Sequence, residues 1–579
     1  MADGNEDSSP CDFGMSWILN SESTCIPDLA SSHLCNEHER EAGLDHFRGA
    51  DLHGHFSGHP GGGVDATTSS WAGIIPETKE KLKRAVRSRE LQLFLLVFVL
   101  LFISIMPLSG SNEKSHFALT AAMVSNHSFV ITGYAPFATP DVSNYSGASL
   151  SALDPGLSVL LLVPFAIGTF LGPLINPFLG SFAVAGYATG GQVLLVQLFS
   201  AICTAVSAVY VYKLCLAIGS KRTSATATGL VYAFATLVWV YGKTSFAHTY
   251  SALFLVVAYY YLFRGTIPRT RDLLFAGISA ALAVSVEYTN LLLLLPALVL
   301  LATKRGKSAK EYVAFLPPIV AGASLLLLYN YVCFGNPLVF PENHWVGYGA
   351  PVSDLLKEFS TPLPVGLREL LFSTTSGLLV YCPILVLAVP SFFLLAKTRR
   401  KEALVLASVF VINFVVYATW HEPSGGGSYG PRYLVASLPF LVVPMSLLIE
   451  SIYRARSTIP RRGGAFCLTG LFSASALISS LGAVTSATGS FTIVFLQILL
   501  GHPTALFDPR VPLFGDLAYP VFFDAARCLN VSEPAAAVAF WLLLTACACG
   551  AFALALRDVR MELAAETRGP QEGSSSLGR

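Results

Sequence analysis

The chain has 579 residues, of which 53% are hydrophobic and only 13% are charged, and its mean hydropathy is +0.59. Soluble domains carry about twice that charged fraction, so the composition excludes a large soluble enzyme and indicates an integral membrane protein. The net charge of +1 favours no particular partner, and no nucleic acid partner is expected.

The segment 1–90 is predicted to be a disordered cytoplasmic tail with a basic end. Most of it is rich in Gly, Ser, Asp and His and has no periodicity. Its His and Cys residues fit no metal-ligand spacing, and the chain has no Cys-x-x-Cys pair, so no metal site is predicted. Residues 79–90 carry six Lys or Arg, which keeps this flank of the first span in the cytoplasm. Because the segment is polar, no cleavable signal peptide is expected.

Apolar runs of about 20 residues, long enough to cross the hydrocarbon layer, recur from residue 91 onward. Basic clusters on one side of these runs hold 27 of the 37 Lys and Arg, whereas the segments on the other side hold seven. This alternation predicts an all-α bundle of about twelve transmembrane helices with both termini in the cytoplasm. The predicted spans are 91–110, 191–212, 224–241, 247–263, 273–287, 290–303, 312–331, 369–396, 402–420, 433–450, 464–485 and 535–556.

The apolar stretch 156–175 does not fit this alternation, because a crossing there would move every later basic cluster to the other side. Its residues Pro164, Gly172, Pro173 and Pro177 suit a broken segment that is covered by protein. We therefore predict a re-entrant or interface-lying helix within a long first lumenal loop.

The resulting domain organisation has a core over residues 91–450 with lumenal loops at 111–190 and 332–368. C-terminal transmembrane helices follow over 451–556 with a lumenal loop at 486–534, and residues 557–579 form a second cytoplasmic tail. Three N-glycosylation sequons fall in segments assigned to the lumen, which supports the topology. The sequons begin at Asn126, Asn144 and Asn530.

Three carboxylates of the first lumenal loop are candidate catalytic residues: Glu113, Asp141 and Asp154. Long loops in compact proteins are usually functional, and a carboxylate near the membrane surface can act as a general base on an acceptor hydroxyl. Spacing alone does not separate this role from that of carboxylates that face water. Asp141 ranks first and Glu113 second.

Arg432 is the candidate for binding a phosphate. It is the only basic residue of the 421–432 loop and follows a glycine-rich turn. Glycines let a backbone approach a ligand closely, and Arg can hold a phosphate with two parallel hydrogen bonds. An Arg that snorkels at a helix end is the alternative. Lys243 and His248 are predicted on the same side and could join it.

Glu287, next to Tyr288, lies in an apolar stretch. An ionisable group inside a membrane is a functional-site candidate. The alternative is a Glu at the lumenal surface, beside the short turn that ends at Asn290. The sequence leaves both readings open.

Several segments resemble GT-C superfamily membrane glycosyltransferases, including relatives of protein O-mannosyltransferases and lipid A aminoarabinose transferases. The segments are NEKSHFALTAAMVSNHSFVI, DVSNYSGASLSALDPGLSVLLLVP, TSFAHTYSALF, VEYTNLLLLLP, YNYVCFGNPL, TSGLLVYCPILVLAVP and ATWHEPSGGGSYGPRYLVASLPFLVVP, which together span most of residues 91–450. In the second segment the residues in the family's register are Asp141, Tyr145, Gly147, Ser151, Pro155, Gly156 and Ser158.

This resemblance implies an inverting hexosyl- or pentosyltransferase. The sequons and the disordered tail favour the endoplasmic reticulum or another secretory-pathway membrane. The donor of this transferase would be a polyprenyl- or dolichyl-phosphate sugar, with no certain cofactor, and its acceptor a glycan, lipid or protein. Two departures affect this expectation. Leu153 stands where relatives carry a Lys, and His421 begins a segment that reads Trp-Trp-Gly-Gly in many relatives.

Two other functions remain open. Twelve spans with cytoplasmic termini also suit a transporter of solutes or lipid-linked sugars, although the chain shows no internal repeat. A catalytically inactive family member is the third reading, and the altered segment around Leu153 favours it.

Overall fold

The computed structural model describes residues 88–179, 182–265, 268–303, 309–348, 355–426, 428–455, 457–484 and 533–567. All of them belong to one compact unit, Ala72–Arg579. The predicted tail before residue 88, nearly all of the 486–534 loop with Asn530, and residues 568–579 lie outside the described residues.

Five described helices are long and apolar enough to cross a membrane, and a pair bent by 43° makes a sixth if it is counted as one span. The chain is therefore a mostly helical, multi-pass membrane protein, as predicted, but the number of about twelve spans is not confirmed. The five are α7 (Gly190–Ala217), α13 (Ala309–Phe334), α17 (Arg400–Thr419), α20 (Thr458–Val484) and α23 (Glu533–Thr567), and the bent pair consists of η9 (Arg432–Ser437) with α18 (Leu438–Val442) and α19 (Met445–Arg454).

The other predicted spans also contain helices, but these helices are short or interrupted. The 369–396 segment is broken near Gly377 and Pro383, because Pro cannot donate to the preceding turn. These elements are α2 (Arg89–Phe102), α8 (Arg222–Phe234), α9 (Val238–Gly242), α10 (Ala247–Phe263), α11 (Thr270–Val286), η4 (Tyr288–Leu294), α12 (Leu295–Thr303), α14 (Leu363–Phe372), α15 (Leu378–Tyr381), η8 (Pro383–Leu387) and α16 (Ala388–Thr398).

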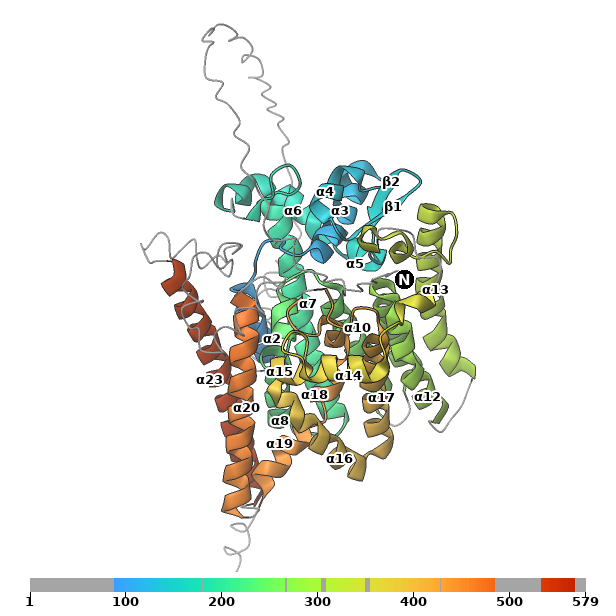
Figure 1. The fold of residues 1–579 in the computed structure, drawn as a ribbon. Helices are drawn as coiled ribbons and strands as arrows, with labels where there is room; N and C mark the ends of the chain where they lie inside the picture. The colour runs from blue at the N-terminus through green and yellow to red at the C-terminus, as the bar shows by residue number, and fades with distance from the viewer. Residues whose placement is uncertain are drawn as a thin grey trace, which may run out of the picture. The chain divides into compact units, whose positions relative to one another are not determined.

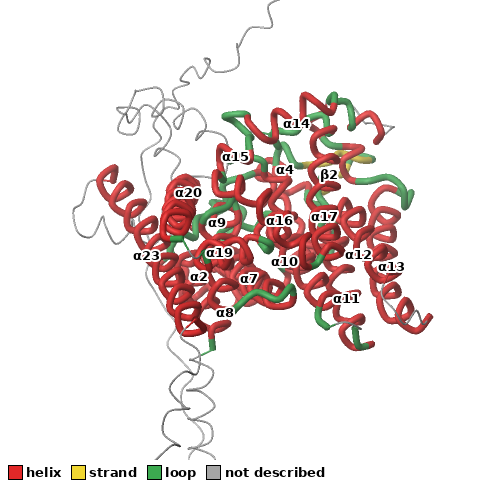
Figure 2. The backbone as a smooth tube through the Cα atoms, turned by 90° about the horizontal axis from the view of Figure 1, so that it is seen from below, coloured by secondary structure: helices red, strands yellow, loops and turns green. Residues whose placement is uncertain are grey.

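The helices form two neighbouring groups. α10, α11, α12, α13 and α17 lie side by side, and α20 with α23 lies at the opposite edge next to α8 (Figures 1 and 2). Close approach between helices depends on small residues. A Cβ added at Gly277 of α11, for example, would come within 2.4 Å of the carbonyl oxygen of Phe315 in α13.

The C-terminal helix α23 continues beyond the predicted membrane end at residue 556. Its last turns are held by polar contacts from other elements. Arg89 of α2 lies 3.0 Å from Asp558, the Thr223 hydroxyl of α8 donates to Glu562 at 2.5 Å, and Lys221 pairs with Glu566. Residues predicted to begin a tail are therefore part of the helical bundle up to Thr567.

The only two strands among the described residues lie in the loop predicted over residues 111–190. Strands β1 (Val142–Tyr145) and β2 (Ala148–Ser151) pair antiparallel, with Val142 opposite Ser151. The two residues between them, Ser146 and Gly147, have φ of 49° and 80°, as tight hairpin turns require. The loop also forms α3 (Ser111–Asn126), α4 (Ala135–Ala138), α5 (Pro155–Leu160) and α6 (Leu162–Ile175).

The stretch 156–175 folds as α5 and α6, and neither helix is long enough to count as a membrane span. α6 packs against α7 and exposes Val163, Phe170 and Leu174 by 66, 82 and 71%. A short helix with an exposed apolar face suits an interface-lying segment. The prediction for this stretch is consistent with that geometry.

The first loop and the 332–368 loop meet near one end of the described helices. Ser143 of β1 forms an isolated bridge with Trp345, and its hydroxyl donates to the carbonyl oxygen of Pro341 at 2.5 Å. Pro341 begins a short turn, η5 (Pro341–His344). The two loops thus form a roof over the ends of α10 and α17 (Figure 1).

Candidate active site

A cavity of about 270 Å³ lies under this roof. Its wall combines one guanidinium group, Arg432, with several carboxylates and three imidazoles. The carboxylates come from both loops, from the end of α11 and from the segment after α17, so distant parts of the sequence meet here. The carboxylates and imidazoles in the wall belong to Asp141, Asp154, Glu287, Glu342, Glu422, His116, His248 and His421.

Arg432 reaches the cavity from the first residue of η9, directly after the glycine-rich turn. Gly425 and Gly430 have φ of +79° and +65°, values that L side chains rarely adopt. The guanidinium lies over the ring of Tyr433 at 5.1 Å and donates to its hydroxyl at 3.4 Å. Among the described residues its Nε has no hydrogen-bond partner. Arg432 thus lines the cavity with a donor that no described residue uses.

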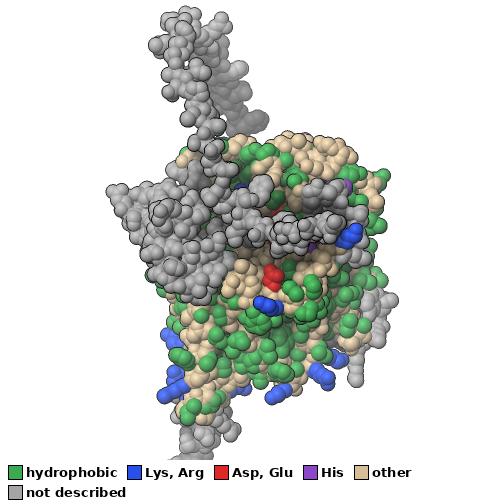
Figure 3. Space-filling model, in the orientation of Figure 1, with side chains coloured by type: hydrophobic (Ala, Val, Ile, Leu, Met, Phe, Trp, Pro, Cys, Tyr) green, Lys and Arg blue, Asp and Glu red, His purple; other side chains and the backbone are tan. Residues whose placement is uncertain are grey.

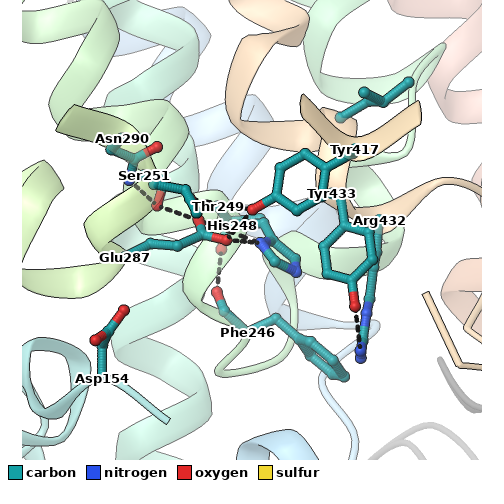
Figure 4. Close-up of polar contacts among 12 residues, drawn as sticks. Asp154, Phe246, His248, Thr249, Ser251, Glu287, Asn290, Tyr417, Arg432 and Tyr433 are labelled. Carbon is teal, nitrogen blue, oxygen red and sulfur yellow. Dashed lines mark hydrogen bonds and ion pairs between the residues drawn. The ribbon is translucent and has the colours of Figure 1, made fainter. Parts of the chain in front are cut away.

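Glu287 is a wall residue of the cavity and the centre of a polar network (Figure 4). His248 Nδ1 lies 3.1 Å from its Oε1, and the hydroxyls of Ser251 and Tyr417 each donate to the carboxylate at 3.0 Å. Tyr417 stacks on Tyr433 with ring centres 4.4 Å apart. The contacts thus run from Glu287 to Tyr417, from Tyr417 to Tyr433, and from Tyr433 to the Arg432 guanidinium.

Asp141 lines the cavity together with Arg432. The hydroxyl of Ser111 donates to its Oδ2 at 2.8 Å, and the hydroxyl of Ser115 donates to its main-chain carbonyl oxygen at 2.6 Å. Burial raises the pKa of the Asp141 carboxyl, while the charge of Arg432 and the Ser111 hydrogen bond act in the opposite direction. Asp141 is therefore a more basic carboxylate than one in water.

Asp154 and Glu342 form an acidic pair in the wall. The main-chain N–H of Tyr288 donates to Asp154 Oδ2 at 3.0 Å. Burial and the nearby charge of Glu342 raise the pKa of Asp154 well above its ordinary value, and burial raises the pKa of Glu342 to about 7. Two carboxyls in one buried site cannot both ionise easily. Sequence reasoning missed Glu342, although it is a carboxylate in the 332–368 loop.

Two predicted site residues are buried but do not line this cavity. Glu113 is fully buried and accepts hydrogen bonds from the main chain of Gly110 at 2.7 Å and from Gln197 of α7 at 3.0 Å. The Lys243 ammonium is also buried and donates to the carbonyl oxygen of Ala483. The structure therefore does not bring either residue to Arg432, and both have structural contacts instead.

His421, where the sequence departs from the resembling family, belongs to the cavity wall. Its Nδ1 lies 2.6 Å from Glu358, which is almost fully buried. The sequons at Asn126 and Asn144 are exposed, at the end of α3 and in β1. Among the described residues, no three His, Cys, Asp or Glu gather in a metal-binding group.

Residues 177–329 match the family model described as dolichyl-phosphate-mannose-protein mannosyltransferase. Over this segment the predicted resemblance to GT-C membrane glycosyltransferases is confirmed. The matched segment includes His248, Glu287 and Tyr288, but neither Asp141 nor Arg432. None of the curated proteins matches the chain.

Two solved structures are similar to this chain at low sequence identity. ArnT from Cupriavidus metallidurans bound to undecaprenyl phosphate has a TM-score of 0.45 at 14% identity, covering 80% of this chain and 77% of that one. The apo oligosaccharyltransferase of Archaeoglobus fulgidus has a TM-score of 0.41 at 10% identity, covering 74% and 60%.

Proposed function

We propose that this protein transfers a sugar from a polyprenyl- or dolichyl-phosphate donor to an acceptor on the lumenal side of a secretory-pathway membrane. One observation carries the proposal: Arg432 and the buried carboxylate of Asp141 line the same cavity. A cation that can bind phosphate and a carboxylate that can remove a proton are the two groups that this reaction needs. The match of the central segment to a family of sugar transferases supports the same chemistry.

In the proposed mechanism Arg432 binds the donor phosphate and stabilises the negative charge that grows on it as the sugar–phosphate bond breaks. Asp141 accepts the proton of the acceptor hydroxyl. The hydroxyl oxygen then forms a bond to the anomeric carbon while the lipid phosphate leaves with the bonding electron pair. A single displacement of this kind inverts the configuration at the anomeric carbon.

The network around Glu287 has a positioning role in this proposal. Tyr417 donates to Glu287 and stacks on Tyr433, which in turn contacts the Arg432 guanidinium. Groups that are held in place before the reaction lose little free energy in reorganisation. Glu287 and His248 would thus fix Arg432 without contacting the reacting atoms.

The orientation follows from charge. Lys and Arg side chains gather at the lower end of the face in Figure 3, away from the end where the two loops meet. Basic loops favour the cytoplasm, so we place the cavity on the lumenal side of the endoplasmic reticulum or a related membrane, with both termini cytoplasmic.

A transfer assay tests the proposal. The purified full-length protein would be incubated with a panel of dolichyl-phosphate sugars and with glycan, lipid and peptide acceptors, and glycosylated product would be measured by mass spectrometry. We expect product with at least one pair and its loss in Asp141→Asn. Release of sugar across proteoliposomes without a new glycosidic bond would instead indicate a transporter, and binding without product an inactive relative.

A further inference from the structure

Two polar side chains of helix α3 line the cavity but have no part in the proposed mechanism. Asn112 and His116 are four residues apart and therefore lie on one face of the helix. Both line the cavity, although they are only 8% and 1% exposed. Within the part of the chain that the structure describes, Asn112 Oδ1 and His116 Nε2 have no hydrogen-bond partner.

The other ring nitrogen of His116 is fixed by a neighbour. Nδ1 lies 3.2 Å from the hydroxyl of Ser158 in α5. Burial lowers the pKa of His116 to about 3, so the ring is neutral at physiological pH. A neutral imidazole has one donor and one acceptor nitrogen, so Nε2 of this cavity-lining residue has one hydrogen-bonding function that no described residue uses.

A third polar residue of α3, in contrast, has hydrogen-bond partners for its side chain. Thr120 lies one turn beyond His116, and its hydroxyl contacts the carbonyl oxygens of His116 and Ser158 at 2.8 and 3.0 Å. Thr120 is not among the residues that line the cavity. In α3, the two side-chain atoms without a hydrogen-bond partner therefore belong to residues that line the cavity, whereas the hydroxyl one turn further on has partners.

We propose that Asn112 and His116 form a subsite that binds hydroxyl groups of a sugar ring. Both side chains are neutral and directional, which suits hydroxyls, whereas the phosphate is matched by Arg432. A site built to hydrogen-bond a hydroxyl rejects a ligand without it, because its buried polar atoms then stay unpaired. This inference rests on the proposed function, and the ring is either that of the donor sugar or that of an acceptor sugar.

The test separates these two sources with the purified full-length protein. The first arm compares the affinities for dolichyl phosphate carrying mannose or glucose with the affinity for bare dolichyl phosphate. The second arm measures binding of methyl mannoside and methyl glucoside while dolichyl phosphate is bound. The variants are Asn112→Leu and His116→Phe, with His116→Gln as the conservative change and Thr120→Val as the matched control on the same helix.

We expect sugar-dependent affinity to fall about 3–10-fold for each of Asn112→Leu and His116→Phe, in the first arm for a donor subsite or in the second for an acceptor subsite. Affinity for bare dolichyl phosphate should not change, His116→Gln should recover part of the loss, and Thr120→Val should behave like the parent. Unchanged sugar-dependent affinity in both arms, or a parent without any, overturns the inference while leaving lipid phosphate binding intact. Failure of the parent to bind dolichyl phosphate would instead overturn the proposed function.

Discussion

Arg432 is the residue on which the proposed phosphate contact depends. Arg432→Lys replaces a planar fork by a point charge, and charged hydrogen bonds contribute about 1.5–3 kcal/mol each. We therefore expect affinity for dolichyl phosphate to fall about 10-fold or more. The measurement is lipid binding by the purified variant, with Arg454→Lys, at the exposed end of α19, as control. Equal affinity in parent and Arg432→Lys would exclude the role.

Asp141 should show a different pattern, since it acts on the acceptor and not on the lipid. General-base catalysis contributes about 10²–10⁴-fold in rate. Asp141→Asn should therefore lose most turnover and keep its affinity for dolichyl phosphate. Rates and affinities should be measured on the same preparation. Turnover close to that of the parent would show that another group accepts the proton.

The pair of Asp154 and Glu342 predicts a pH effect on stability. Burial raises the pKa of Glu342 from 4.5 to about 7, so the folded chain retains a proton that the unfolded chain releases. The stability contributed by this group is complete below about pH 4.5 and is lost as the pH rises through 7. Glu342→Gln removes this titration and should raise the melting temperature more at about pH 8 than at about pH 5. A shift that is equal at both pH values would contradict the assignment.

Several site residues could be predicted from the sequence because each carries a local signal. Asp141, His248 and Arg432 were assigned to one side of the membrane, and all three line one cavity. Glu342 and His116 were missed because their role depends on neighbours that are far away in the sequence. Lys243 shows the converse problem: it was assigned to the same side of the membrane as Arg432, but its ammonium donates to Ala483 and it does not line the cavity.

At the scale of the element, α3 depends on Glu113. Its carboxylate accepts from Ser109 and Gly110 before the helix and from Gln197 of α7. A carboxylate near a helix N-terminus also stabilises the helix dipole.

We predict that Glu113→Gln destabilises the protein by about 1–3 kcal/mol but preserves turnover per folded molecule. The apparent melting temperature and the rate corrected for active protein separate the two effects. A stable variant without turnover would return Glu113 to the catalytic candidates.

The elements themselves were predicted better than their lengths. Every predicted span contains helix, because apolar runs report on burial in a membrane. Hydropathy does not report where a run is interrupted. The break of α11 at Glu287, which is extended with φ of −159°, and the hairpin of the first loop both serve the cavity, and tertiary contacts that a single sequence does not show hold them in place.

At the scale of the whole molecule, the topology is open to a direct test. We expect glycans on Asn126 and Asn144 when the chain is expressed in a eukaryotic secretory system, because both are exposed and follow the basic flank of the first span. Loss of a glycosidase-sensitive mass shift in Asn126→Gln and Asn144→Gln measures this. A glycan on a sequon engineered into residues 304–310 would refute the orientation.

The continuous helix α23 offers a practical route to imaging this membrane protein. Its 35 residues extend for about 52 Å without a break, and contacts to Asp558, Glu562 and Glu566 hold the final turns against α2 and α8. A rigid marker domain joined in helical register after Thr567 would therefore follow the orientation of the bundle. Electron microscopy could then use the marker to align particles.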